Sequence, residues 1–324
     1  MSTLKWGLVG YGDLAEKRVA SALQSASGSE LSGVWGRSPQ RTQDFAARHG
    51  IASAFDSLED LVRSDVDAVY VCTPPESHLE YSLAALNAGK HLLVEKPMAS
   101  SVEDCSLIIE AAQANQVTLG VAYYRRGYPK MQKIKELIDG GVLGIPTWVN
   151  IAAHSWFAPN ADDPKHWRVE KAQSAGGGAV ADIGVHRFDL LDYWLGPSKV
   201  LFSDAQRLVH KDAHYEVEDG LSAVLQLKNG APVHIYFSWN SKTWLDRFEI
   251  VGSEGKIITD PLDGPSLVVV RGREREELQI EPPANAHVPC VENFVKAVEN
   301  NTKPLCDGEA GMRANQLLQS VLSV

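Results

Sequence analysis

The chain has 324 residues, of which 44% are hydrophobic and 22% charged, and its formal net charge at pH 7 is −10. This composition is that of a folded globular protein, and the length favours two domains over one. The acidic balance, with basic runs no longer than Arg125-Arg126, argues against a surface that follows nucleic-acid phosphates.

Short apolar runs alternate with amphipathic segments up to about residue 122. The runs predict strands at Leu4 to Val9, Leu31 to Trp35, Ala68 to Cys72, His91 to Val94 and Val117 to Ala122. The helices predicted between them are Asp13 to Ser25, Arg41 to His49, Leu79 to Ala88 and Val102 to Ala114. This alternation indicates βαβ units and a doubly wound parallel sheet. We therefore expect an α/β chain whose residues 1–122 form an NAD(P)-binding Rossmann domain.

The turn after the first predicted strand has the pattern of a dinucleotide-binding loop. Gly10, Gly12 and Ala15 form a GxGxxA match between a strand and a helix, which is the context that gives the motif meaning. Helix-end N–H groups there would face a pyrophosphate. The cofactor contacts predicted from this turn are Gly10, Tyr11, Gly12, Asp13, Leu14 and Ala15. A plain glycine turn is the alternative.

The end of the second strand lacks the acid with which NAD-preferring folds hold the ribose hydroxyls. Arg37 and Ser38 follow Gly36 there, and Arg41 comes one helical turn later, so the three could cradle a 2′-phosphate. One charge-assisted bond contributes ~1.5–3 kcal/mol, or about ten- to a hundredfold in affinity. We predict NADP(H) as the preferred cofactor and keep NAD(H) as an alternative, in which Arg37 is only a solvated strand-end residue.

Glu95-Lys96-Pro97 closes the strand His91 to Val94. A lysine at the carboxyl end of a parallel strand lies where open α/β sheets bind their ligands. Alone, Lys96 would be interpreted as a surface residue before a turn-forming proline. The glycine turn and the helix described below favour a role at the cofactor.

Residues 123–324 predict a substrate-binding and oligomerisation domain of α+β type. A helix is expected around Met131 to Ile138, and alternating apolar residues predict two hairpins, 221–239 around Asn229-Gly230 and 248–258 around Gly252 to Gly255. The domain should hold a large, mostly antiparallel open sheet with one covered face. We expect its other face to join a homodimer or homotetramer, and the last helix to pack back on the first domain.

Gly176-Gly177-Gly178 precedes a helical pattern from Ala179 to Leu195. At 3.6 residues per turn, Asp182 and His186 lie about one turn apart on one face. Histidine suits proton transfer to or from a hydroxyl near neutral pH. Metal ligation and a structural ion pair are alternatives, and we assign no metal because neither HExxH nor a cysteine cluster accompanies the pair. The glycines are interpreted as room for a close approach to the helix, and Asp189 as a structural partner of Arg187 or another base.

Aromatic and cationic residues suit a polyhydroxylated ring, which stacks through its apolar face and accepts directed hydrogen bonds. About half of the candidates should be packing residues instead. They are Tyr123, Tyr124 and Arg125 after the last Rossmann strand, and His154, Trp156, His166, Trp167 and Arg168 in a stretch interpreted as loop-rich.

Cys72, Cys105, Cys290 and Cys306 are scattered without a CxxC pair, which disfavours disulfides and structural zinc. The first strand begins too early for an export leader, and the apolar runs are too short to span a membrane. We expect a cytoplasmic enzyme with a small-molecule carbohydrate or polyol partner, and neither nucleic acid nor a membrane.

These segments, in this order, resemble the glucose-fructose oxidoreductase, inositol dehydrogenase and MocA (Gfo/Idh/MocA) family from Leu4 to the last helix. Thr73-Pro74-Pro75 with His78, Trp167-Arg168 and Glu249 to Gly255 belong to the same resemblance. It implies that Lys96 neutralises alkoxide charge near the nicotinamide, that His186 is the general acid/base, and that Asp182 holds the reacting hydroxyl or orients His186. Thr73, Pro74, His78 and Glu95 join the predicted cofactor-binding residues. Tyr123, Arg125, Trp156, Trp167, Arg168, Asp182 and His186 are the predicted substrate-binding residues.

Two departures from the family pattern bear on function. Gly36 replaces the acid of NAD-using relatives, and the leader of the periplasmic glucose-fructose enzymes is missing, which disfavours their tightly held cofactor. Members act on sugars, inositols, keto-sugars, aromatic dihydrodiols and biliverdin, and some carry Tyr in place of His186. We expect an NADP(H)-dependent oxidoreductase that interconverts a secondary alcohol and a ketone on a sugar, polyol, keto-sugar or cyclic diol. A redox-neutral glycosidase or eliminase with retained NAD, and an inactive dinucleotide-sensing regulator, are the alternatives.

Overall fold

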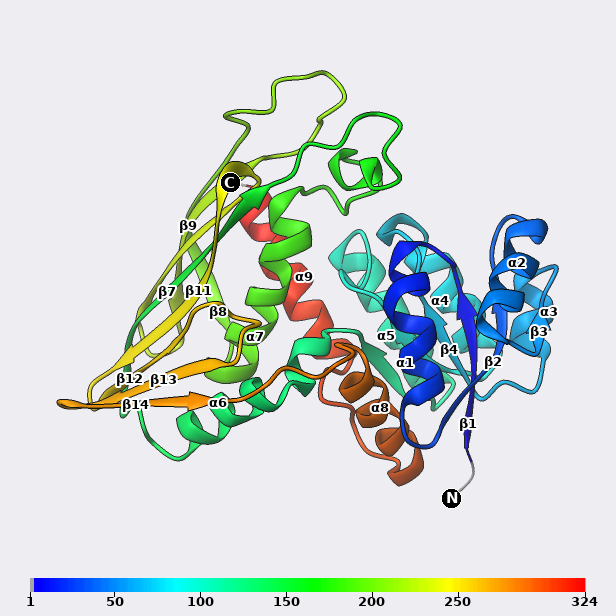
Figure 1. Cartoon of the computed structure of the whole chain (residues 1–324), viewed down its shortest axis with the longest axis horizontal. Helices are drawn as coiled ribbons and strands as arrows, with labels where there is room; N and C mark the ends of the chain where they lie inside the picture. The colour runs from blue at the N-terminus through cyan, green and yellow to red at the C-terminus, as the bar shows by residue number, and fades with distance from the viewer. Residues whose placement is uncertain (1–2, 324) are drawn as a thin grey trace. The chain divides into compact units, whose positions relative to one another are not determined.

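The computed structural model describes residues 3–323, which form two compact units (Figure 1). The first unit contains residues up to 127 together with 283–312, and the second contains 128–282 together with the chain from 313 onward. The expected domains were 1–122 and 123–324, with the last helix packing back on the first; the first unit also includes 283–312. The sequence pattern of that segment is helical, and a helical pattern does not say which sheet the helix covers.

The first unit is built on a parallel six-stranded sheet in the order β3-β2-β1-β4-β5-β6. Its strands are β1 (Leu4–Val9), β2 (Ser29–Trp35), β3 (Ser53–Ala54), β4 (Ala68–Val71), β5 (His91–Val94) and β6 (Leu119–Val121). The strand order reverses between β1 and β4, and such a switch point is where open α/β sheets bind dinucleotides. The predicted Rossmann sheet is confirmed, although β3 was not foreseen.

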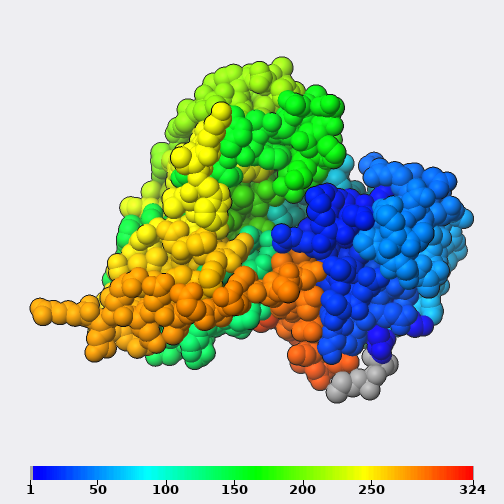
Figure 2. All heavy atoms as spheres, in the orientation of Figure 1, coloured from blue at the N-terminus to red at the C-terminus, as the bar shows by residue number. Residues whose placement is uncertain are grey.

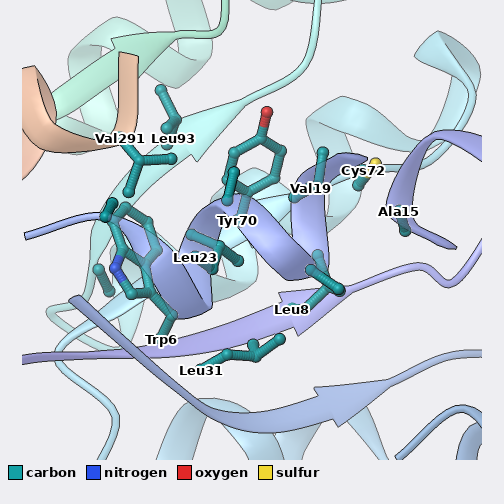
Figure 3. Close-up of a cluster of buried hydrophobic side chains, with 14 of the residues drawn as sticks. Trp6, Leu8, Ala15, Val19, Leu23, Leu31, Tyr70, Cys72, Leu93 and Val291 are labelled. Carbon is teal, nitrogen blue, oxygen red and sulfur yellow. The ribbon is translucent and has the colours of Figure 1, made fainter. Parts of the chain in front are cut away.

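Helices cover this sheet. They are α1 (Ala20–Ser25), α2 (Pro39–His49), α3 (Leu58–Arg63), α4 (His78–Asn87), α5 (Val102–Ala114) and α8 (Val288–Asn300), with short 3₁₀ turns η2 (Pro75–Ser77) and η3 (Tyr124–Gly127). Trp6 of β1 is fully buried, and its ring centroid lies 5.3 Å from that of Phe294 in α8 and 6.3 Å from that of Tyr70. Figure 3 shows Val291 of α8 in the same core. Burying each such side chain contributes ~1.5–3 kcal/mol, so α8 completes the first unit's core.

The second unit is built on an eight-stranded sheet in the order β14-β13-β12-β11-β7-β10-β9-β8. Its strands are β7 (Pro146–Trp156), β8 (Ser198–Gln206), β9 (Gly220–Leu227), β10 (Pro232–Ser238), β11 (Asn240–Gly252), β12 (Gly255–Thr259), β13 (Ser266–Arg271) and β14 (Glu274–Gln279). Both predicted hairpins are present, with Val233 opposite Leu225 and Ile250 opposite Ile257. The pair β7–β10 is parallel and the other pairs are antiparallel, which confirms a mostly antiparallel sheet.

Strand β7 corrects the expectation of a loop-rich stretch around His154 and Trp156. It pairs with both β10 and β11 near the middle of the sheet. Val149, Ile151 and Ala153 alternate inward and are buried, as a half-covered strand requires. The apolar residues Trp148 and Ala152 on the other face of the strand blurred this alternation in the sequence. Figure 2 shows the hairpin of β13 and β14 (orange) extending from one edge of the second unit's sheet.

One face of the second sheet is covered by α6 (Pro129–Asp139), α7 (Val185–Leu195) and the later turns of α9 (Gly308–Leu322). Arg187 of α7 bonds Asp246 of β11, and both side chains are buried. Its Nη1 also donates to the carbonyl oxygen of Ile183 at 2.6 Å. Arg187 thus points to the sheet, and the basic partner predicted for Asp189 stays a prediction.

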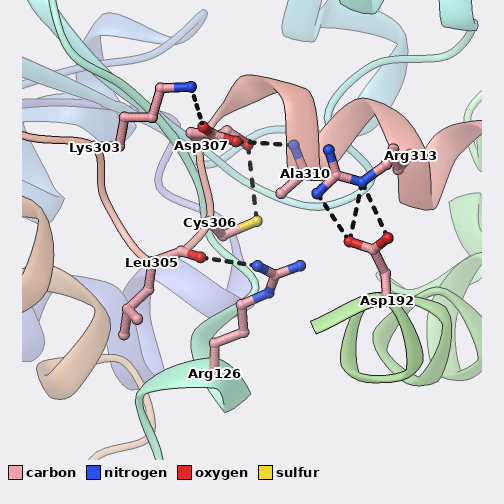
Figure 4. Close-up of polar contacts among 8 residues, drawn as sticks. All are labelled: Arg126, Asp192, Lys303, Leu305, Cys306, Asp307, Ala310 and Arg313. Carbon is pink, nitrogen blue, oxygen red and sulfur yellow. Dashed lines mark hydrogen bonds and ion pairs between the residues drawn. The ribbon is translucent and has the colours of Figure 1, made fainter. Parts of the chain in front are cut away.

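Helix α9 begins in the first unit and ends in the second. In the first unit, Asp307 accepts the N–H of Ala310 at 2.9 Å, which caps the start of the helix. In the second unit, the Arg313 guanidinium donates twice to the Asp192 carboxylate, at 2.9 and 3.0 Å (Figure 4). The start of α9 is thus capped within the first unit, and Arg313 attaches the following part of the helix to α7 in the second.

Candidate active site

A pocket of about 300 Å³ lies at the carboxyl ends of β1, β2 and β4 in the first unit. It collects most of the residues predicted to bind the cofactor. Those that line it are Gly10, Tyr11, Gly12, Arg37, Ser38, Arg41, Thr73 and Pro74. Neighbouring lining residues include Trp35 and Tyr81, whose rings meet edge to face at 5.4 Å. The pocket thus joins the glycine turn to the cationic end of β2.

The two glycines of the turn are required for different reasons. Gly10 has φ +98°, and a Cβ there would lie 2.6 Å from the carbonyl oxygen of Cys72, so backbone crowding excludes a side chain. A Cβ on Gly12 would meet nothing within 4 Å among residues 3–323. That open space lets a ligand approach the backbone at the start of the following helix. The turn therefore fits a dinucleotide pyrophosphate.

The other predicted cofactor residues lie behind the pocket or beside it. Asp13 pairs with Lys17 at 2.6 Å on the helix surface, and Ala15 is fully buried in the core that Leu14 partly covers. His78 is fully buried, with Nε2 2.8 Å from the carbonyl oxygen of Thr73 and Nδ1 3.0 Å from that of Pro97. Burial lowers the pKa of His78. The imidazole therefore joins the pocket loop to the segment that carries Lys96.

Glu95 is also buried, and its carboxylate contacts the backbone of Lys96. Its carboxylate accepts the hydroxyl of Tyr70 at 2.7 Å and the backbone N–H of Lys96 at 3.2 Å, and His287 Nε2 lies 3.4 Å away. Burial alone would raise the pKa of Glu95, but the bonds from His287 and Tyr70 hold it below its usual value. Glu95 therefore holds the backbone of Lys96, and its predicted contact with the cofactor stays a prediction. Its partner His287 precedes α8, and no sequence motif marked it.

In the second unit, Asp182 lies at the start of the helix that carries His186. Its carboxylate accepts a hydrogen bond from Arg168 Nη1 at 3.1 Å, and the Arg168 guanidinium lies 5.5 Å from the Trp167 ring centroid. Trp167 and Arg168 belong to the 3₁₀ turn η4 (His166–Val169). Three of the predicted substrate residues are thus brought together. His186 is 5% exposed on the same helix.

The remaining predicted substrate residues have contacts within their own units. At the end of β7, the Trp156 ring meets the His210 ring edge to face at 4.8 Å between centroids, and the Lys242 ammonium lies 5.1 Å from the Trp156 ring centroid. Tyr123 and Arg125 belong to the first unit, where both are buried and the Arg125 guanidinium lies 5.0 Å from the Tyr124 ring. Trp156 thus contacts one residue of the loop after β8 and one of β11, and its predicted role at the substrate stays a prediction.

Both motif-bearing helices open with a π turn, η1 (Ala15–Val19) and η5 (Val180–Gly184). In η5 the N–H of Val185 bonds to the carbonyl oxygen of Val180, five residues back. The stretch from Asp182 to His186 is therefore partly π-helical, and the expected separation of about one turn stays, because four residues span nearly a full π turn. π turns inside helices are frequent at functional sites.

At Gly178, before this helix, glycine is required because another segment of the chain packs closely against it. A Cβ on Gly178 would lie 2.4 Å from the carbonyl oxygen of Glu218 and 2.6 Å from Val217 Cγ2. The neighbour that comes close is thus another segment of the chain, so the interpretation of the glycines as room for a ligand is wrong at Gly178. The Glu218 carboxylate accepts the N–H groups of Gly178 at 2.8 Å and Val180 at 2.9 Å, which anchors the helix start. No sequence motif pointed to Glu218.

Comparison with known proteins places both halves of the chain in one group. Residues 4–123 match the family described as "Oxidoreductase family, NAD-binding Rossmann fold", and residues 131–258 match the "GFO/IDH/MocA C-terminal domain". The 1,5-anhydro-D-fructose reductase of Ensifer adhaerens is 31% identical over 95% of this chain and 92% of its own. The scyllo-inositol 2-dehydrogenase (NADP(+)) of Bacillus subtilis is 28% identical over 92% of this chain and 89% of its own.

Among solved structures, a levoglucosan dehydrogenase in complex with NADH and L-sorbose has the same fold. Its TM-score is 0.90 at 21% identity, over 100% of this chain and 96% of that chain. Within residues 3–323, no helix has the length and apolar composition needed to cross a membrane. The same residues contain no group of three or more His, Cys, Asp or Glu side chains arranged to hold a metal.

Glu218 generates a prediction about pH. Burial raises the pKa of Glu218 to about 7, although the backbone N–H bonds oppose the shift. The folded state then binds more protons than the unfolded state between pH ~4.5 and ~7, so stability falls as pH rises through that window. We expect wild-type stability to fall by ~1–3 kcal/mol relative to Glu218→Gln across it. Denaturant unfolding of both proteins at pH 5 and pH 8 measures this difference, and parallel pH dependences would contradict it.

Proposed function

The chain belongs to the Gfo/Idh/MocA family of NAD(P)-dependent oxidoreductases, and from this membership we propose a more specific function. The protein interconverts a secondary alcohol and a ketone on a sugar, polyol, keto-sugar or cyclic diol, with NADP(H) preferred over NAD(H). The observation that carries the proposal is the pocket at the strand ends, which combines an open glycine turn with two cations, Arg37 and Arg41. Two similar proteins, a 1,5-anhydro-D-fructose reductase and an NADP(+)-dependent scyllo-inositol dehydrogenase, carry activities of this class in their names and support the proposal.

The residues of the chain have separate roles in this proposal. When bound, the nicotinamide would supply or accept the hydride. His186 gives a proton to, or takes one from, the reacting hydroxyl oxygen, and Lys96 offsets negative charge on that oxygen. Asp182, held by Arg168, orients the hydroxyl or His186. Lys96 belongs to the first unit and His186 to the second, so the proposal requires both to reach one substrate.

The acid/base role leads to a direct test. His186→Asn should lower kcat by about 10² to 10⁴, the usual contribution of a positioned acid or base. The dissociation constant for the dinucleotide should stay the same, because Arg37 and the glycine turn lie in the other unit. A sugar and polyol screen that follows reduced-nicotinamide absorbance identifies the substrate for this comparison. Unchanged turnover would remove His186 from the mechanism, and cofactor that survives purification would favour the redox-neutral alternative.

The cofactor preference is tested by titration. Arg37→Ala should weaken NADP+ binding about ten- to a hundredfold, because it removes a charge-assisted contact to the 2′-phosphate. NAD+, which lacks that phosphate, should bind with nearly unchanged affinity. Arg63→Ala is the matched control, since it removes the same charge from an exposed pair with Glu59 on α3. Equal affinity of the wild-type protein for the two dinucleotides would overturn the preference.

We also propose that the outer face of the second sheet joins two or four copies of the chain. Tyr236 alternates with the inward Ile235 and Phe237 and is 40% exposed, and Phe202 of β8 is 53% exposed. A large exposed apolar area usually marks an interaction surface. The edge strand β14 (Glu274–Gln279) is unsuited to forming an interface by strand addition. It is largely exposed and carries several charges, which discourage such pairing.

This assembly predicts a change of mass in solution. Tyr236→Arg would place an uncompensated charge in the interface, so the variant should dissociate at micromolar concentration. Glu110→Arg, on the exposed side of α5 in the first unit, should leave the mass unchanged. Light scattering coupled to size exclusion measures both. A wild-type protein that is monomeric at micromolar concentration would contradict the proposal.

A further inference from the structure

Tyr11 lies directly over the position where an NAD-selecting acid would stand. A Cβ built on Gly36 would lie 2.1 Å from Tyr11 Cε1, 2.6 Å from Cδ1 and 2.8 Å from Cζ. Real Cβ atoms do not approach other atoms this closely, so any side chain at position 36 requires the ring to move. With the Tyr11 ring in this place, position 36 has room only for glycine.

The ring is held in this place by several contacts. The Tyr11 hydroxyl accepts the backbone N–H of Ser38 at 2.9 Å, which ties the ring to the turn after β2. The guanidinium of Arg41 lies 5.0 Å from the ring centroid, within the range of a cation–π contact. On its inner side the ring lies 6.2 Å, centroid to centroid, from the fully buried ring of Phe45. Displacing the ring would cost the Ser38 bond and release Arg41.

The turn itself is braced around the same point. Thr42, which is 1% exposed, donates its hydroxyl to the carbonyl oxygens of Gly36 at 3.2 Å and Ser38 at 2.9 Å. Tyr11, Ser38 and Arg41 all line the pocket. One aromatic side chain from the glycine turn thus organises the side of the pocket that the proposed function assigns to the 2′-phosphate.

We propose that Tyr11 is a specificity-determining residue for the dinucleotide. Its ring keeps position 36 free of an acid, and its hydroxyl and face hold Ser38 and Arg41 where they meet a phosphate monoester. The proposal rests on the NADP(H) preference proposed above. It adds that positions 11 and 36 are coupled, so that a carboxylate at position 36 holds ribose hydroxyls only when the ring at position 11 is removed.

The test is a four-protein cycle of wild type, Gly36→Asp, Tyr11→Ala and the double variant. Titration gives the dissociation constants for NADP+ and NAD+ without reference to turnover. Gly36→Asp should lose NADP+ affinity about a hundredfold without gaining NAD+ affinity, because the carboxylate displaces the ring and repels the phosphate. Tyr11→Ala should lose NADP+ affinity about five- to tenfold. The double variant should bind NAD+ at least about tenfold more tightly than Gly36→Asp, a non-additive result.

The outcomes separate this inference from the proposed function. Equal affinities of the wild-type protein for NADP+ and NAD+ would contradict the proposed NADP(H) preference. The coupling between positions 11 and 36 is tested by the dissociation constants for NAD+ alone. If Gly36→Asp gains as much NAD+ affinity as the double variant, the ring is no obstacle and the inference fails. If Gly36→Asp does not fold, the NADP+ affinities of Tyr11→Phe and Tyr11→Ala test the positioning role of Tyr11. Tyr11→Phe, which lacks only the hydroxyl, should weaken NADP+ binding by less than Tyr11→Ala, and wild-type affinity in both variants would overturn the positioning role.

Discussion

A carboxylate removed from water must find hydrogen bonds inside the protein, and in both units this requirement fixes a segment that carries a predicted catalytic residue. In the first unit, Glu95 draws in Tyr70 and His287 and holds the backbone of Lys96. In the second unit, Glu218 gathers the N–H groups at the start of the helix that carries Asp182. The buried Asp246 secures Arg187, the neighbour of His186, to the sheet. The groups proposed to meet substrate are therefore attached to backbone that buried carboxyl groups hold in place.

Local patterns were enough to predict much of the fold. Continuous apolar runs such as His91 to Val94 gave the parallel strands, and the Asn229-Gly230 hairpin was marked by its turn chemistry. Strand β7 was missed because the apolar residues Trp148 and Ala152 lie on its less buried face and mask the period of two. The place of α8 could not be predicted, since its contact with Trp6 joins residues at opposite ends of the chain.

The candidate site shows the same division. Residues that belong to a contiguous motif, such as Gly10 and Gly12, were found from sequence. Glu218 and His287 were not, because their role depends on which distant segment folds against them. Glycine is ambiguous for the same reason: Gly12 faces open space, whereas Gly178 faces the backbone of Glu218, and only the coordinates tell the two apart. A glycine run signals close approach without saying what approaches.

The return of residues 283–312 to the first unit affects how this chain could be recombined with its relatives. A hybrid that exchanged only the residues up to 127 would take Trp6 and Glu95 from one parent, but Phe294 and His287 from the other. The mismatched pairs would be Trp6 with Phe294 in the Rossmann core and Glu95 with His287 next to Lys96. Successful shuffling would need three junctions, one at each point where the chain passes from one unit to the other.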